Sequence, residues 1–113
     1  MNMISYEGIG EVVATVAMPD EIKVGAPVRM KDNDQVCACT SGEVFCGIAL
    51  KRNGNIGCMQ VKGFVSVPYS GSIQLGWVNL VANGNGGVRS DANGRSVLVV
   101  CADSGSKTAV ICL

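Results

Sequence analysis

The sequence has no histidine and little charge. Its 113 residues include nine Lys or Arg and nine Asp or Glu, 16% of the chain, where soluble domains average about 25%. Histidine is the commonest general base and the commonest metal ligand, so its absence argues against an enzyme, a cofactor or a metal site. A net charge of zero argues against a nucleic-acid partner, because neutralising phosphates requires an excess of Lys and Arg.

Long hydrophobic runs are also missing. The longest apolar run, Val97 to Ala102, has six residues, whereas a membrane-spanning helix needs about 20. Glu7 and Glu11 interrupt the N-terminal region, which therefore does not read as a signal peptide. We expect a protein without a membrane partner that is made in a reducing cytoplasm.

Six cysteines are present, and most alternate with apolar residues in strand-like segments: Cys37, Cys39, Cys46, Cys58, Cys101 and Cys112. In a reducing compartment this pattern predicts reduced thiols in the core rather than disulfides. Cys37 and Cys39 would share one face of a strand. The paired knuckles or histidines of a zinc site are absent from the sequence. A small cytosolic thiol or metal-binding protein using this pair remains an alternative.

Period-2 alternation and β-branched runs recur between turn residues, which predicts an all-β fold with little or no helix. We expect a small β-barrel or sandwich of short antiparallel strands, formed by residues 9–113 as a single domain. The predicted strands are Ile9 to Ala17, Val28 to Met30, Gln35 to Cys39, Val44 to Lys51, Ile56 to Val67, Trp77 to Ala82, Val88 to Ser90, Ser96 to Ala102 and Thr108 to Leu113.

A weak internal repeat relates the two halves of the chain. Ile22-Lys-Val-Gly25 matches Ile73-Gln-Leu-Gly76, and Gly47-Ile-Ala-Leu50 corresponds to Val97-Leu-Val-Val100. One interpretation is two similar β-units around one core. The other is that any all-β chain of regular rhythm matches itself at some offset.

The glycine-rich segment Asn83 to Gly87 leads into Val88-Arg89 rather than a helix, and it has no Lys-Ser or Lys-Thr. It therefore predicts a hairpin turn, not a phosphate-binding loop. Trp77, the only tryptophan, heads a predicted strand. The sequence favours a core position for it, although a lone Trp can also anchor an interface. We take Trp77, Asn83 and Asn85 as candidate oligomer or lattice contacts.

Residues 1–8 precede the first strand and form a candidate N-terminal arm. The arm is either a frayed terminus or an extended segment that adds to the edge of a partner's sheet. Under the second interpretation its partner-binding residues are Asn2, Met3, Ile4, Ser5 and Tyr6.

The order of several motifs resembles one known family. An E-G pair near the N-terminus is followed by I-K-V-G-A-P-V, G-I-A-L, V-K-G-F-V-S-V-P, I-Q-L-G-W-V-N-L and a terminal strand after D-S-G. This frame resembles the bacteriophage capsid decoration, or cement, proteins (DUF2190-like) over about Glu7 to Leu113. Two departures are that Trp77 stands where the family has Asp, and that Val97 to Val100 lacks the family's glycine.

The resemblance implies a structural virion protein rather than an enzyme. Such a protein would bind the major capsid protein on the outside of an icosahedral capsid, commonly as a homotrimer, and would stabilise the assembled shell by mass action. The alternative is another phage structural component, such as a tail, baseplate or head-fibre base subunit.

Overall fold

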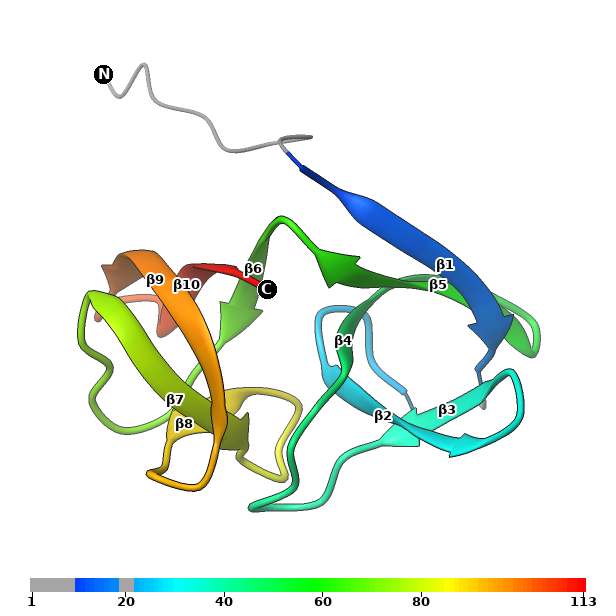
Figure 1. Ribbon diagram of the computed structural model, residues 1–113, viewed down its shortest axis with the longest axis horizontal. Helices are drawn as coiled ribbons and strands as arrows, with labels where there is room; N and C mark the ends of the chain where they lie inside the picture. Colours follow the sequence, from blue (N-terminus) through cyan, green and yellow to red (C-terminus); the bar gives the residue numbers. More distant parts are fainter. Residues whose placement is uncertain (1–9, 19–21) are drawn as a thin grey trace.

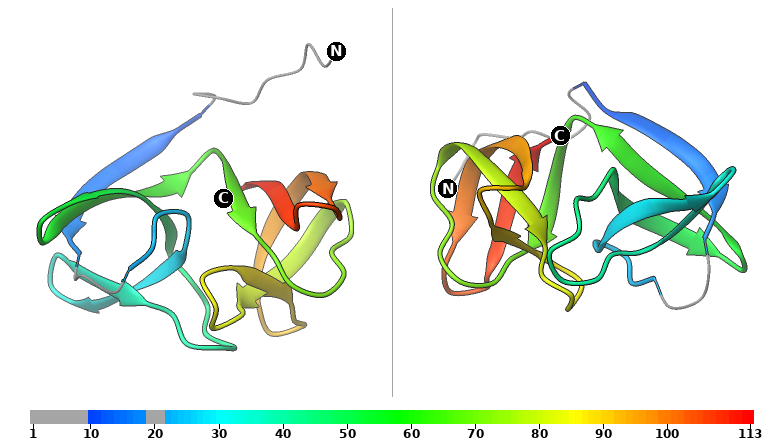
Figure 2. Two further views of the ribbon diagram at one scale, coloured as in Figure 1. Left: turned by 180° about the vertical axis from the view of Figure 1, so that it is seen from behind. Right: turned by 60° about the horizontal axis from the view of Figure 1, so that its bottom comes forward.

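A computed structural model describes residues 10–18 and 22–113, and this part of the chain contains ten strands and no helix. The predicted all-β class is therefore confirmed. Two β-units lie side by side (Figure 1), and the two further views show the same arrangement (Figure 2). The first five strands form a closed barrel in the order β1-β3-β2-β4-β5, and the last five form a sheet in the order β6-β10-β9-β7-β8.

The barrel strands are β1 (Val12–Ala17), β2 (Pro27–Asp32), β3 (Gln35–Ala38), β4 (Gly47–Asn53) and β5 (Ile56–Lys62). The strands of the second sheet are β6 (Phe64–Pro68), β7 (Gly76–Ala82), β8 (Val88–Ser90), β9 (Arg95–Asp103) and β10 (Thr108–Cys112). Six of the barrel's side chains form a hydrophobic cluster: Met18, Ile22, Val28, Val36, Ala49 and Met59.

The two halves share one topology. Each strand of the first half has a counterpart five strands later, and the antiparallel pairings repeat in the same order. One parallel contact also repeats, because Ala17 pairs with Gln35 in the barrel and Tyr69 pairs with Val88 beside the second sheet. The sequence repeat therefore corresponds to a repeat in structure.

Irregular features of the backbone repeat as well. The pairing of β4 with β5 skips Leu50, and the pairing of β9 with β10 skips Val100, so each half has a bulge at the end of its matched motif. Gly25 and Gly76, the last residues of the other matched motif, have φ of 91° and 94°, which residues other than glycine rarely adopt.

One strand prediction was wrong. The segment expected as a single strand from Ile56 to Val67 is divided into β5 and β6 at Gly63. Gly63 has φ of 94°, and a Cβ atom there would lie 2.9 Å from the Cα of Glu11. The backbone turns at this residue, so the second half begins without a linker. The amide of Leu113 donates a 3.0 Å hydrogen bond to the carbonyl of Gly63, which places the C-terminus at the same junction (Figure 1).

The halves also share a core. Phe45 and Ile48 belong to the first half by sequence, yet they lie in the cluster of the second sheet with side chains that include Val67 and Leu80. Phe45 is 1% exposed and Ile48 is fully buried. The guanidinium of Arg95 lies 5.7 Å from the centre of the Phe45 ring, and its Nη1 donates to the carbonyl of Cys46.

Candidate interaction surface

A row of four apolar side chains crosses the outer face of the second sheet. Trp77 in β7 pairs with Leu98 in β9, Leu98 with Cys112 in β10, and Cys112 with Phe64 in β6. The adjacent positions Val97, Val99 and Ile111 are buried. Because successive side chains of a strand point to opposite faces, the row lies on the face away from the sheet's core.

Trp77 is the most prominent member of this outer row. Its side chain is 73% exposed and the nearby Leu75 is 67% exposed, whereas Leu98, Cys112 and Phe64 are partly exposed. The sequence favoured a core position for Trp77, and that prediction was wrong. Its strand begins at Gly76 in a register that directs Val78, not Trp77, toward the hydrophobic cluster.

Beside the outer row is an open cleft of about 450 Å³. Trp77 and Val78 contribute to its lining together with the polar side chains of Gln74, Asn79 and Ser90. A central apolar row with polar groups at its margin has the composition of a protein interface.

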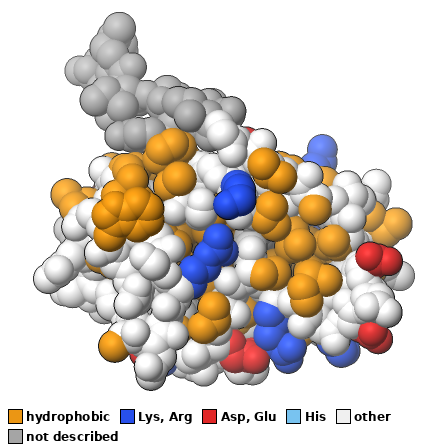
Figure 3. Space-filling view, viewed as in Figure 1, with side chains coloured by type: hydrophobic (Ala, Val, Ile, Leu, Met, Phe, Trp, Pro, Cys, Tyr) orange, Lys and Arg blue, Asp and Glu red, His pale blue; other side chains and the backbone are white. Residues whose placement is uncertain are grey.

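Charged side chains are absent from the outer row and from the neighbouring row formed by Cys101, Val110 and Ser66. Figure 3 shows hydrophobic side chains gathered near β9 and β10 and again over the barrel, with Lys and Arg side chains between the two groups. Exposed tryptophan and leucine on an uncharged sheet face favour contact with another protein over contact with nucleic acid.

The second candidate site is the loop from Asn83 to Gly87. The Oδ1 atom of Asn83 accepts hydrogen bonds from the backbone amides of Asn85 and Gly87, at 2.8 and 3.0 Å, and its Nδ2 donates to Ser70 at 3.2 Å. This side chain therefore holds the hairpin loop in shape. Asn85 is exposed and borders a cleft of about 300 Å³ whose lining includes Lys23 and Cys39.

The structure does not bring the candidate contact residues together. Trp77 lies at the beginning of β7, and Asn83 follows its end. At about 3.3 Å per residue these two positions are about 20 Å apart. The candidate arm residues, Asn2, Met3, Ile4, Ser5 and Tyr6, lie outside the described residues.

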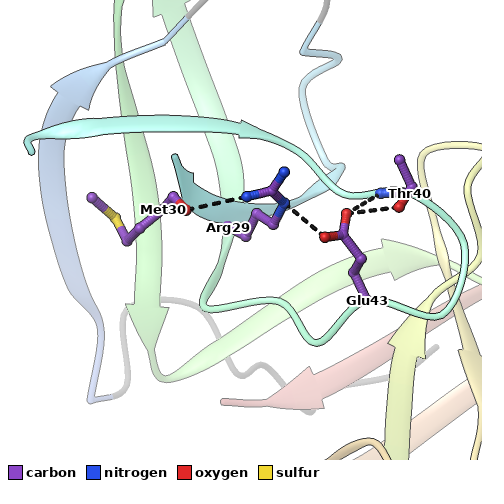
Figure 4. Close-up of polar contacts among 4 residues, drawn as sticks. All are labelled: Arg29, Met30, Thr40 and Glu43. Carbon is purple, nitrogen blue, oxygen red and sulfur yellow. Dashed lines mark hydrogen bonds and ion pairs between the residues drawn. The ribbon is translucent and has the colours of Figure 1, made fainter. Parts of the chain in front are cut away.

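Polar contacts within the first half hold the loop between β3 and β4 in place. The Oε1 atom of Glu43 accepts hydrogen bonds from the amide and the hydroxyl of Thr40, at 2.6 and 2.8 Å. Its Oε2 lies 2.8 Å from Nε of Arg29, which is an ion pair rather than an aligned hydrogen bond (Figure 4). The amide and hydroxyl of Thr40, followed by the Arg29 charge, lower the pKa of Glu43 from its ordinary 4.5.

Backbone hydrogen bonds attach the same loop to β7. The amide of Gly42 donates to the carbonyl of Ala82, and the amide of Ala82 donates to the carbonyl of Glu43, both at 2.9 Å. The loop that carries Phe45 is therefore held against the second half by backbone hydrogen bonds.

The cysteines are free, as expected. The core assignment was right only in part: Cys39 packs against the cluster of the second sheet and Cys46 against that of the barrel, but none of the six is fully buried and Cys101 is exposed. Burial, followed by the charge of Glu43, raises the pKa of Cys39 to about 12. Burial also raises the pKa of Cys46. Both thiols stay protonated near neutral pH, which makes them poor nucleophiles.

No group of three or more His, Cys, Asp or Glu side chains is placed to hold a metal ion within residues 10–18 and 22–113. The described part of the chain also has no helix long and apolar enough to cross a membrane. Comparison with protein-family models gives no match, and comparison with curated proteins gives no significant one. The surface itself is therefore the basis for a functional proposal.

Three partners of Trp77 in the outer row were not identified from the sequence. Leu98, Cys112 and Phe64 are ordinary strand residues there, and only the strand register aligns them with Trp77. The available signal was their alternation with the buried positions Val97, Val99 and Ile111.

Proposed function

We propose that this chain is a structural virion protein that decorates the outer surface of an icosahedral phage capsid. It binds the major capsid protein, self-associates as a homotrimer and stabilises the assembled shell. It is made in the host bacterial cytoplasm and is located on the capsid exterior.

The observation that carries this proposal is the outer row, an uncharged apolar face with an exposed tryptophan. It suits a protein that works by packing against other proteins. The ordered motifs that resemble capsid decoration proteins direct the proposal toward a capsid. A protein that binds only the assembled lattice stabilises that lattice by mass action, and the effect grows with the logarithm of its free concentration once that exceeds the Kd.

The proposed capsid contact is the N-terminal arm, which would add an extended strand to the edge of a capsid-protein sheet. The test is cosedimentation of the purified protein with expanded capsids of its own phage. The full chain should bind, and a variant lacking residues 1–6 should keep its circular dichroism spectrum but lose binding. A variant with those six residues shuffled is the matched control for length and composition.

The results separate three questions: whether the chain binds capsids, which part of it makes the contact, and where it lies in the virion. Failure of the full chain to bind expanded capsids overturns the proposed function. Normal binding by the truncated variant places the contact elsewhere, and the exposed loop at Asn85 is then the first region to mutate. A particle reconstruction that locates the chain in the tail, the baseplate or a head fibre would favour the alternative structural role instead.

A further inference from the structure

Four asparagines of the chain are followed directly by glycine: Asn53, Asn83, Asn85 and Asn93. Such asparagines are chemically labile, because glycine has no Cβ atom to keep its backbone nitrogen away from the preceding side chain. The nitrogen can then attack the side-chain amide and expel ammonia. Attack requires a side chain and a glycine amide that are free of hydrogen bonds, and a backbone that can rotate between them.

The side chain of Asn83 is held by three hydrogen bonds. Its Oδ1 accepts from the amides of Asn85 and Gly87, and its Nδ2 donates to Ser70. The side chain therefore cannot turn toward the nitrogen of Gly84 while the loop is intact. We expect Asn83 to react only when the loop opens, because these bonds must break first.

At Asn93 it is the attacking group that is held. The amide of the next residue, Gly94, donates a 2.9 Å hydrogen bond to the carbonyl of Asp91. The backbone of Gly94 also lies against β7, because a Cβ atom there would be 2.5 Å from the carbonyl oxygen of Leu80. The nitrogen that would attack Asn93 is therefore fixed by a hydrogen bond and by packing.

Asn53 is restrained by its place in a strand. It is the last residue of β4 and pairs with Ile56 in β5. A paired strand residue has an extended backbone, which turns the next nitrogen away from the residue's own side chain. Closing a five-membered ring at Asn53 would require this residue to leave the ladder. Its side chain is exposed, so its protection comes from the strand.

Asn85 meets all three requirements. It is exposed, and its side chain makes no hydrogen bond to the described residues. The peptide group that joins it to Gly86 has neither its carbonyl nor its amide in a hydrogen bond within residues 10–18 and 22–113. Gly86 has φ of 87° and space around it, since a Cβ atom there would meet only Cδ of Lys23, at 3.8 Å. This peptide group can therefore rotate without breaking a hydrogen bond.

We propose that Asn85 is a site of spontaneous deamidation, in which the backbone nitrogen of Gly86 attacks Cγ of Asn85. The N–Cγ bond forms and the Cγ–Nδ2 bond breaks, and Nδ2 leaves as ammonia together with the proton of the Gly86 amide. Water then opens the five-membered imide at either of its carbonyls, which leaves aspartate or isoaspartate at position 85. This modification goes beyond the proposed function and does not depend on the capsid role.

The reaction changes the surface at a candidate oligomer or lattice contact. A carboxylate replaces the amide, so a chain with no net charge becomes negative. The new charge lies at the cleft that Asn85 borders together with Lys23. In the isoaspartate product the main chain also runs through the former side-chain carbon, which lengthens the loop.

The test measures the loss of each amide in the purified full chain at pH 8. Peptide mass spectrometry follows all four asparagines over time, and fragment ions separate Asn83 from Asn85. Asn85 should convert first, within about threefold of its rate in urea, whereas the other three should be slower than in urea by about tenfold or more. The chain in urea is the control, because all four pairs there lack structure. The proposal is overturned if another of the four converts faster in the folded chain, or if folding slows Asn85 as much as the others.

Two variants give an independent measurement by ion-exchange chromatography. Asn85→Gln should lose the early acidic species, since its longer side chain closes an imide ring far more slowly. Asn93→Gln changes another exposed asparagine before glycine and should form acidic species at the wild-type rate. Wild-type kinetics in Asn85→Gln, or loss of the early species in Asn93→Gln, would overturn the proposal. Mass spectrometry of the wild type decides the question if a variant does not fold. Capsids take no part in either measurement, so failure here and failure of the proposed function are separate results.

Discussion

At the scale of single residues, two residues of the same type differ in burial and in hydrogen bonding because their surroundings differ. Cys39 borders the cleft near Lys23 and its thiol is partly buried, whereas Cys101 lies exposed on β9. Asn83 uses its amide to hold a loop, whereas Asn85 presents its side chain to solvent. The residue type alone does not distinguish the two members of either pair.

The two cysteines give a prediction for thiol chemistry. The pKa of Cys39 is raised to about 12 by burial and by Glu43, so only about one in 10,000 of these thiols is ionised at pH 8. We expect iodoacetamide at pH 8 to modify Cys101 well before Cys39, as measured by peptide mass spectrometry over time. Equal rates in the folded protein would contradict this, and equal rates in denaturant are the control.

Trp77 illustrates what sequence could not provide at this scale. Hydrophobicity predicts that a lone tryptophan is buried, but strand register decides which face receives it. Here Trp77 and Val78 are both apolar, and Val78 packs against the cluster. The choice depends on pairing with β9, which a single sequence does not reveal.

At the scale of elements, the existence and approximate location of the short strands were easier to predict than their exact boundaries. Val88 to Ser90 was predicted with the observed bounds, and most other strands were located within a few residues. The break at Gly63 was missed because Val61 to Val67 reads as a continuous β-run. The cause is a close approach of the backbone at Glu11, which is a contact between segments distant in sequence.

The loop between β3 and β4 gives a prediction at the element scale. Phe45→Ala should lower the free energy of unfolding by about 3–5 kcal/mol, since it leaves a cavity in the cluster of the second sheet. Val44→Ala is the neighbouring control, because Val44 is 51% exposed, and it should cost less than about 0.5 kcal/mol. Urea unfolding followed by circular dichroism measures both, and similar values would show that the loop does not stabilise the second half.

At the scale of the whole molecule, the two halves repeat one topology. The barrel has a hydrophobic cluster of its own, but the cluster of the second sheet contains side chains from both halves. Phe45 and Ile48 cross from the first half into the second cluster. The repeat was visible in sequence through Ile22 to Gly25 and its match at Ile73 to Gly76. The shared core was not, since the position of Phe45, two residues before Gly47, is occupied in the second half by Arg95, two residues before Val97.

The shared core predicts cooperative unfolding. Removing Phe45 and Ile48 from the second cluster would cost roughly 5–10 kcal/mol by the values for such deletions, which is comparable with the total stability of a domain. We therefore expect a fragment of residues 63–113 to show no cooperative urea transition. In the full chain, hydrogen exchange should give the most protected amides of β4 and β9 the same free energy of opening.

Independent unfolding of the two halves would be visible in either of these measurements. A fragment of residues 63–113 with a sharp transition of its own, or amides in β9 that open at much lower free energy than those in β4, would show that the halves are independent. The matched control is the full chain with Val44→Ala, which should keep the coincident values.

The turn at Gly63 also has a consequence for the order in which the protein forms during synthesis. Val12 pairs with Lys62, and Phe64 pairs with Cys112, which are separations of 50 and 48 residues. Within residues 10–18 and 22–113, no strand pairing connects residues before Gly63 with residues after it, so the barrel can close while the rest of the chain is still being translated. Until β6 to β10 emerge from the ribosome, Phe45 and Ile48 remain uncovered, and the nascent barrel exposes this apolar surface to the segment that emerges next.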